Sequence, residues 1–407
     1  MLISSHYLVA IALVIYVPLP AWAQSISEKV WAVFAYSVHG ESTPRVAPPP
    51  WTLTAYGANG LHTAGSSFRD RYIMMYPQAV PPDLQIQNLS PYSLQLDEVS
   101  VLSAADQPAI ASAQAFMQGL YPPVDTSYGA PYIDPSSQLS NGSYVTYPLH
   151  GYQYPAIVTL GLSDPGSPVV AGQSSCPRHQ TLVEKYNASP EAGRLAQESK
   201  SFYANLYDQL LADTFQPSSV GYTNAQDISE YLGYQSIHNA SFSYNLDLQD
   251  IDRARWLADQ YTFATSGNLS SGAKIRAIAG RTLASHILGA FSANIQHVGM
   301  QKQVSLAFGG YEPAVALASL MGLASTSTAN FYSRPVAGAS LIFELFSYES
   351  EQFPPYPNLS DLFVRFLLHN GTDSYTKFVP YPLFGHGPSN IAIPLSEFRA
   401  EMESFAL

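Results

Sequence analysis

The sequence of 407 residues contains little cysteine and few charged residues, and these two features limit the disulfides and the binding partners that are possible. Cys176 is the only cysteine, which excludes an intrachain disulfide and leaves a buried thiol, a bond to another chain or an orphaned residue. Only 12% of the residues are charged, and 18 Lys and Arg face 30 Asp and Glu, for a net charge of −12. Because nucleic acids and anionic membranes require a basic surface, neither is an expected partner. In contrast, 28 Tyr and 31 Pro are many, and they predict polar, loop-rich surfaces.

An apolar run near the N-terminus has the pattern of a secretory signal. Residues 8–17 are apolar, Pro18 and Pro20 follow, and Ala21-Trp22-Ala23 matches the small-x-small cleavage pattern. The segment before the run has no Lys or Arg, which departs from the usual pattern. We expect a signal peptide at residues 1–23 and a secreted protein, extracellular or in a cell wall. No later segment offers ~18 uncharged apolar residues, so no membrane span is expected.

Acceptor motifs for N-glycosylation agree with export. In each motif an Asn stands two residues before Ser or Thr, without an intervening Pro. One such motif arises easily by chance, but several spread along a chain behind a signal sequence indicate a glycoprotein. The expected acceptors are Asn88, Asn141, Asn187, Asn239, Asn268, Asn358 and Asn370.

Hydrophobic periodicity predicts early and late strands separated by a block of helices. The expected strands are residues 29–37, 84–96, 99–102, 304–308, 340–347 and 362–368. The expected helices are residues 56–72, 109–120, 190–215, 225–236, 248–265 and 274–297. Between residues 123 and 168, Pro, Gly, Ser and Tyr indicate long loops. This order predicts an α/β layer that is interrupted by a helical insertion.

Several segments together resemble the histidine acid phosphatases, the branch of the histidine phosphatase (phosphoglycerate mutase-like) superfamily that includes phytases. The segments are VHGESTP, LTAYGANGLHTAGSSFRDRYI, SAQAFMQGLYPP, IAGRTLASHILGAF, AVALASLMGL, AGASLIFELF and FVRFLLHNGT. The likeness is best to secreted fungal members and covers most of the mature chain. It implies a three-layer α/β domain with a mixed central sheet and a mostly helical insertion. We expect the core at residues 24–125 and 298–407, and the insertion at residues 126–297.

The family's catalytic motif is Arg-His-Gly-x-Arg-x-Pro, and its nucleophilic histidine falls on His39. Gly40 and Pro44 also match, whereas other groups of the site are replaced. A third family arginine and a His-Asp pair, which supplies the general acid, are expected in later segments. In the motif, the two arginine positions hold Val38 and Ser42. The third arginine is expected within residues 103–113, where Pro108 stands, and the His-Asp pair is expected at Gly310 and Tyr311.

These substitutions remove the groups that bind and activate a phosphate. A histidine attacks a phosphate dianion only if cations neutralise the phosphate oxygens, and the leaving oxygen requires a proton. Gly40, Glu41, Asp106 and Glu312 are expected neighbours of the pocket, where the carboxylates would repel phosphate. The resemblance therefore implies a phosphatase fold with an impaired site, while His39 alone is also compatible with an ordinary polar residue bonded to the backbone.

Three functions remain open. The first is a pseudophosphatase whose cleft binds a small polar ligand such as a sugar, or no ligand. The second is an acid phosphatase that uses His39 in a non-standard pocket, with Arg45, Arg69 or Arg71 as replacement cations. The third is a glycosylated wall or matrix protein without a ligand. No cofactor is expected, and because no HxH, HExxH or CxxC spacing occurs, no metal is expected; the oligomeric state stays open.

Overall fold

The computed structural model describes residues 27–46, 50–74, 84–123, 138–145, 147–174, 176–269, 274–326, 331–349 and 356–407. The expected signal peptide lies outside these residues. Strand β1 (Ser27–Val38) is the centre of the sheet, with a parallel neighbour on one side and an antiparallel neighbour on the other. The sheet order is β3-β2-β4-β1-β5-β6-β7, and β8 pairs with β6. The other strands are β2 (Val99–Ala104), β3 (Ile157–Leu160), β4 (Val304–Gly309), β5 (Ser340–Glu349), β6 (Leu362–His369), β7 (Phe378–Tyr381) and β8 (Ala392–Pro394).

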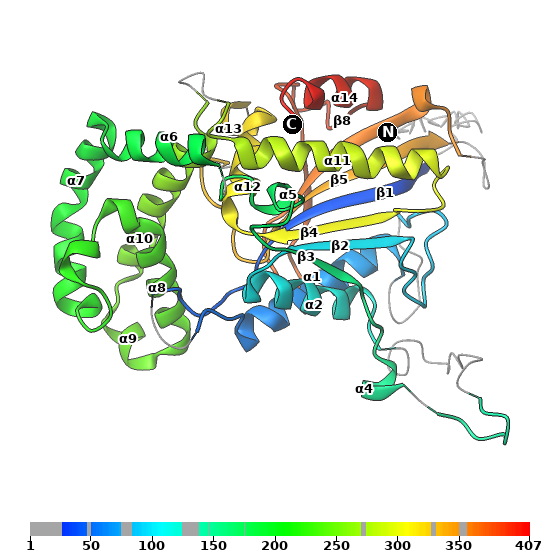
Figure 1. Ribbon diagram of the computed structural model, residues 1–407, viewed down its shortest axis with the longest axis horizontal. Coiled ribbons are helices and arrows are strands. Elements are labelled where there is room, and N and C mark those ends of the chain that lie inside the picture. Colours follow the sequence, from blue (N-terminus) through cyan, green and yellow to red (C-terminus); the bar gives the residue numbers. More distant parts are fainter. Residues whose placement is uncertain are drawn as a thin grey trace, which may run out of the picture.

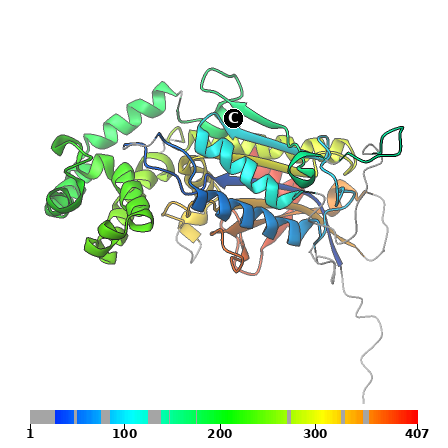
Figure 2. The same cartoon turned by 90° about the horizontal axis from the view of Figure 1, so that it is seen from below.

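Helices cover both faces of this sheet, which makes three layers (Figures 1 and 2). Alternate residues of β1 divide between the layers, because successive side chains of a strand point to opposite faces. Val33 and Ala35 pack with α1 (Ala55–Tyr72) and α2 (Gln107–Leu120). Phe34 and Tyr36 pack with α11 (Ile278–Gln296), α12 (Tyr311–Leu320) and α14 (Leu395–Glu403). The expected three-layer α/β fold with a mixed sheet is confirmed.

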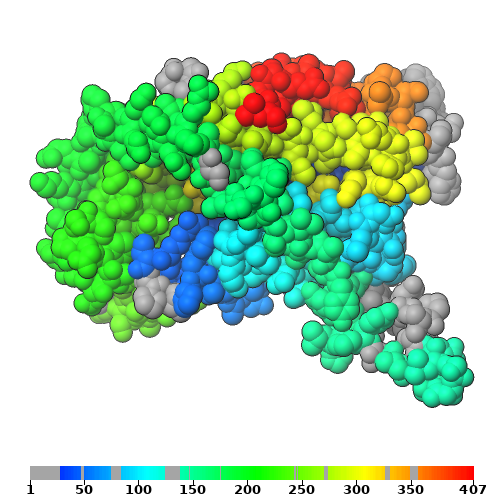
Figure 3. Space-filling model, viewed as in Figure 1, coloured from blue at the N-terminus to red at the C-terminus, as the bar shows by residue number. Residues whose placement is uncertain are grey.

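The helical part beside the sheet has a hydrophobic core of its own. It is drawn in green at one end of the molecule in Figure 1, and a hollow separates part of it from the blue N-terminal residues in Figure 3. Its helices are α6 (Pro177–Asn187), α7 (Pro190–Leu206), α8 (Ala225–His238), α9 (Ala240–Asn245) and α10 (Leu248–Thr262). Two π-helical turns, Tyr207–Leu211 and Phe263–Gly267, follow α7 and α10.

Two elements within the expected insertion, residues 126–297, lie with the sheet. Strand β3 lies inside that range but pairs with β2 in the central sheet. Helix α11 also lies inside the range but contributes Leu283, Ile287 and Phe291 to the core that covers β1. Strand β3 belongs to the α/β core through its pairing with β2, and α11 through the apolar side chains that it buries against the sheet.

Most of the other expected elements are found within a few residues of their expected ends. The exception is the expected strand at residues 84–96, where only an isolated bridge between Ile86 and Val30 joins the sheet. Asn88 has a φ of 61°, which a strand does not adopt, and Pro91 lacks a backbone donor for a ladder. Among the helices of the described residues, none combines the length and the apolar character that a membrane crossing requires.

The acceptor asparagines lie at the surface with one exception. Asn268 is half-buried at the end of a π-helical turn, and the others are exposed. The exposed ones are Asn88, Asn141, Asn187, Asn239, Asn358 and Asn370. Their positions are therefore compatible with the expected glycosylation, which stays a prediction.

Candidate active site

His39 directly follows β1, at the edge where the parallel strands β1 and β4 both end. Its backbone N–H donates to the carbonyl of Gly309 at 2.9 Å, and its own carbonyl accepts from the N–H of Gly338 at 3.0 Å. The hydroxyl of Tyr36 donates to the carbonyl of Gly310 at 2.9 Å. These bonds join the ends of β1 and β4 to the start of α12, so the loop after β1 and the first turn of α12 lie next to each other.

The imidazole of His39 is oriented by the backbone and enclosed by aromatic rings. Nδ1 lies 2.9 Å from the carbonyl oxygen of Gly40. Because a carbonyl oxygen only accepts, Nδ1 carries the proton in the neutral ring and Nε2 keeps its lone pair. The rings of Trp51 and Tyr311 meet the imidazole edge-on, at centroid distances of 5.7 and 5.6 Å. His39 is only 5% exposed. Nε2 therefore has a free lone pair, in an almost fully buried imidazole that two aromatic rings contact.

A cavity of about 260 Å³ opens between His39 and the helical part. The core side is formed by residues 39–42 and Tyr311, and residues 334–337 form a further wall. Helices α8 and α10 close the other side with Glu230, Tyr234 and Arg255 among the lining residues. The sheet and the insertion thus both contribute to the site.

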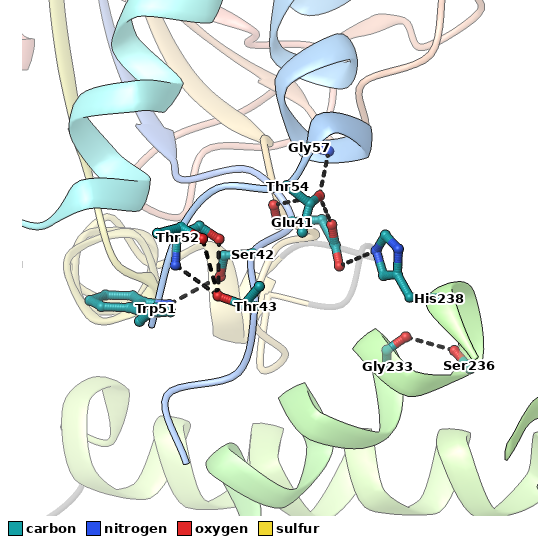
Figure 4. Close-up of polar contacts among 10 residues, drawn as sticks. All are labelled: Glu41, Ser42, Thr43, Trp51, Thr52, Thr54, Gly57, Gly233, Ser236 and His238. Atoms are coloured by element: carbon teal, nitrogen blue, oxygen red, sulfur yellow. Dashed lines mark hydrogen bonds and ion pairs between the residues drawn. The ribbon is translucent and has the colours of Figure 1, made fainter. Parts of the chain in front are cut away.

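The loop after His39 contacts the helical part through Glu41 (Figure 4). One carboxylate oxygen of Glu41 lies 3.0 Å from Nε2 of His238, at the end of α8. The other accepts from the hydroxyl of Thr54, the N-cap residue of α1. The carboxylate of Glu41 therefore already has two partners, His238 and Thr54. An arginine in the motif loop would compete with them for this carboxylate.

Two guanidinium groups line the cavity. Nε of Arg334 donates to Asp259 at 2.9 Å, and the guanidinium lies 3.7 Å from Glu230 and 5.1 Å above the ring of Tyr311. Burial opposes the charge of Arg334, yet Tyr311, Glu230 and Asp259 raise its pKa above the ordinary value. Two carboxylates therefore already neutralise Arg334. Arg255 is exposed and forms no hydrogen bond or ion pair with any residue that the structure describes.

Residues 41–369 match the family model of the histidine phosphatase superfamily (branch 2). The chain belongs to this superfamily. Among solved structures, the phytase of Klebsiella sp. ASR1 is similar with a TM-score of 0.56 and 13% identity, over 94% of this chain and 97% of that chain. The phytase of Citrobacter braakii gives a TM-score of 0.55 and 12% identity, over 94% and 98% of the two chains. At these identities the similarity shows the fold alone, and no curated protein matches the sequence.

A third similar structure is the phytase of Hafnia alvei in complex with myo-inositol hexakis sulphate. Its TM-score is 0.55 and its identity 14%, over 94% of this chain and 98% of that chain. The superfamily match begins at Glu41, two residues after His39. The match therefore does not include His39.

The motif positions at which the resemblance expects arginines hold side chains with other contacts. Val38 is fully buried in the core under α11 and α12. Ser42 lines the cavity, and its hydroxyl accepts from Nε1 of Trp51 at 3.1 Å (Figure 4). This bond holds the indole beside His39. Hence one expected arginine position is part of the core, and the other fixes an aromatic ring.

The later substituted positions are also integrated into local structure. Pro108 is buried in the first turn of α2, which Asp106 caps by accepting from the N–H of Ala109 at 3.0 Å. Gly310 is the N-cap residue of α12, and Tyr311 is its first residue. Of the positions outside the motif, only Tyr311 lines the cavity; Pro108, Asp106, Gly310 and Glu312 do not. Their assigned roles stay predictions.

Tyr311 stands where the resemblance expects part of the His-Asp pair, and its hydroxyl is held in the protonated form. Burial and then Glu230 raise the pKa of Tyr311 well above that of free tyrosine. A phenol held protonated this strongly is a poor proton donor in acidic or neutral solution. Burial, and then the charges of Glu312 and Asp106, raise the pKa of the Tyr36 hydroxyl, which therefore stays protonated and donates to Gly310.

The cations that the sequence suggested lie elsewhere. Arg45 stacks on Trp51, with its guanidinium 3.8 Å from the ring centre. Arg69 donates to the carbonyls of Leu120 and Pro91, and Arg71 donates to Glu344 in the core. None of the three lines the cavity. Sequence reasoning missed the two that do, Arg255 and Arg334, because neither is near the motif in the chain.

Proposed function

We propose that this chain is a secreted, catalytically impaired member of the histidine phosphatase superfamily that binds a small polar ligand, such as a sugar, beside His39. The observation that carries the proposal is the shell around His39. Trp51 and Tyr311 enclose the imidazole, and Arg334 is neutralised by Glu230 and Asp259. A phosphate dianion in this cavity would find little positive charge to balance it.

The same cavity has features that suit hydroxyl groups. Carboxylates accept hydrogen bonds from hydroxyls, and Glu41 and Glu230 both line the cavity. Tyr234 and Tyr311 add aromatic surface with a polar end, which can cover an apolar face of a ligand. A saturable thermal shift with neutral sugars or polyols supports a binding role. A glycosylated wall or matrix protein without a ligand would show no such shift.

A phosphatase assay tests the catalytic half of the proposal. p-Nitrophenyl phosphate and phytate are offered across the acidic range to the purified protein and to an intact family member. Turnover comparable to that of the intact member, abolished by His39→Ala, would overturn the proposal.

A second candidate function is an acid phosphatase with altered chemistry. Two observations favour it: Nε2 of His39 keeps its lone pair, and Arg255 and Arg334 line the same cavity. In this mechanism Arg255 would bind the phosphate, since Arg334 is already held by carboxylates. Loss of measurable phosphatase activity in Arg255→Ala, with unchanged folding, would select this candidate over the first.

Restoring the motif arginines is expected to fail as a rescue. Val38→Arg with Ser42→Arg would place one guanidinium in the core, at a fully buried position, and would break the bond between Ser42 and Trp51. Burying an unpaired charge is strongly unfavourable, so the double variant should unfold more easily and gain no activity. Urea unfolding and the phosphatase assay check both results. As a control, Ser42→Arg alone should fold normally and also remain inactive; robust activity in either variant would contradict the assigned losses at Pro108, Gly310 and Tyr311.

Secretion and glycosylation give a separate prediction. Expressed with its own N-terminus in a eukaryotic secretory host, the protein should appear in the medium with its first residue near Gln24. Intact mass should fall on treatment with an N-glycosidase, by several glycans, because six of the acceptor asparagines are exposed. Asn268→Gln should change the mass least, since this asparagine is half-buried. Retention in the cell with an unprocessed N-terminus would contradict the expected signal peptide.

A further inference from the structure

A second cavity is lined by residues of α11 and of strands β2, β3 and β4. Figure 1 shows where these elements lie in the fold. The cavity has a volume of about 360 Å³, within the range of about 300–1,000 Å³ that is typical of small-molecule pockets. We call it the α11 groove. None of the residues that line it also lines the cavity beside His39.

The groove exists because small side chains face one another across it. Helix α11 contributes Gly289, Ala290 and Ala293 to the lining. Strands β2 and β4 contribute Ser100 and Ser305, whose hydroxyl oxygens lie 3.1 Å apart. A Cβ placed on Gly289 would meet no atom within 4 Å. The space is therefore left open by the sequence of the helix and of the strands.

Large apolar side chains lie at the rim of the groove. Leu96 is 55% exposed and Val158, on the edge strand β3, is 52% exposed. Leu102 of β2 adds a half-buried apolar side chain to the lining. An aliphatic chain in the groove would cover this surface and remove it from water, which favours binding.

The ionisable groups of the groove are basic, although the chain carries a net charge of −12. They are Lys302 and His286, and no carboxylate occurs among the described residues that line the groove. The ammonium of Lys302 has no hydrogen-bond or ion-pair partner among the residues of the described ranges. Burial, and then the charge of Lys302, lower the pKa of His286, so the imidazole is neutral at neutral pH and Lys302 supplies the single positive charge.

We propose that the α11 groove binds a small amphipathic carboxylate, with its aliphatic body between α11 and β2 and its carboxylate on Lys302. A single cation balances a monoanion, and the neutral imidazole and the serine hydroxyls are polar neighbours for the carboxylate oxygens. The groove is independent of the cavity beside His39 and of the proposed function.

Isothermal titration calorimetry with three ligands of equal chain length tests the proposal on the full chain. The ligands are octanoate, 1-octanol and octyltrimethylammonium. Octanoate is expected to bind saturably, 1-octanol about tenfold or more weakly, as expected for the loss of a charge-assisted contact, and octyltrimethylammonium not at all. Absence of octanoate binding at millimolar concentration, or equal binding of octanoate and 1-octanol, would overturn it.

Two variants and one control place the binding in the groove. Gly289→Leu fills the groove with a residue that suits a helix better than glycine, so the protein should fold and octanoate binding should be lost. Lys302→Gln keeps a polar side chain, one atom shorter, without the charge, and should weaken octanoate binding about tenfold, but not 1-octanol binding. Arg255→Ala changes the cavity beside His39 and is the control: it should alter neither octanoate binding nor 1-octanol binding. Octanoate binding that survives Gly289→Leu, or that Arg255→Ala abolishes, would refute the assignment to the groove.

Discussion

Purified protein is expected to hydrolyse p-nitrophenyl phosphate and phytate on the order of 10,000-fold more slowly than a family member that keeps its arginines and its His-Asp pair. Removing one preorganised donor from an oxyanion site costs on the order of 100–1,000-fold in rate. Losses within one cooperative unit do not add in full, so we count the five substituted positions as only two independent losses. Two losses of about 100-fold each multiply to about 10,000-fold. The rate is measured as kcat/KM for both substrates at matched enzyme concentrations.

His39→Ala decides whether any residual rate belongs to this site. If the phosphate clamp is absent, the imidazole has no bound phosphate to attack, and the residual rate should not change. Arg255→Ala should likewise leave the residual rate unchanged, although it removes the one cavity guanidinium without a partner among the described residues. A residual rate that falls at least tenfold in both variants would instead establish a phosphatase built on His39 and Arg255.

The core of the fold was predictable because its signals are local. The apolar run of β1 and the helical spacing from Leu61 to Tyr72 are each encoded within one segment, and they pack on each other. Strand β3 was missed because four residues, Ile157–Leu160, carry little periodicity, and only their pairing with β2 makes them a strand. The expected strand at residues 84–96 failed for the opposite reason, since its apolar residues pack on the core without joining a ladder.

The motif was visible in the sequence, but its surroundings were not. His39 and Ser42 were found because they are adjacent in the chain and match a known pattern. Arg334 comes from the segment before β5 and Arg255 from α10, and only the folded chain brings them to the cavity that His39 lines. The partners of Arg334, Glu230 and Asp259, lie on α8 and α10 of the helical part. A pocket assembled from distant segments leaves no spacing in the sequence by which it can be found.

A buried carboxylate in β5, Glu344, binds side chains from α1 and β6, and nothing in the sequence alone indicates these contacts. Glu344 is fully buried within an apolar strand, where an unpaired charge would be strongly unfavourable. Arg71 donates to one of its oxygens from Nε at 3.0 Å, and the hydroxyl of Tyr72 donates to the same oxygen at 2.6 Å. Nε of Arg365 donates to the other oxygen at 2.7 Å. Thus α1, β5 and β6 are joined through one side chain.

Glu344→Ala is expected to lower the free energy of unfolding by about 3–5 kcal/mol, because it leaves the guanidinium groups of Arg71 and Arg365 without their buried counter-charge. Urea unfolding followed by circular dichroism measures the change. Glu28→Gln is the matched control: Glu28 also bonds Arg365, at 2.9 Å, but its side chain is 27% exposed. Because the Glu28 side chain keeps contact with water and Gln can still accept a hydrogen bond from Arg365, the control should lose less than about 1 kcal/mol. Equal losses in the two variants would show that burial of Glu344 does not set the strength of this cluster.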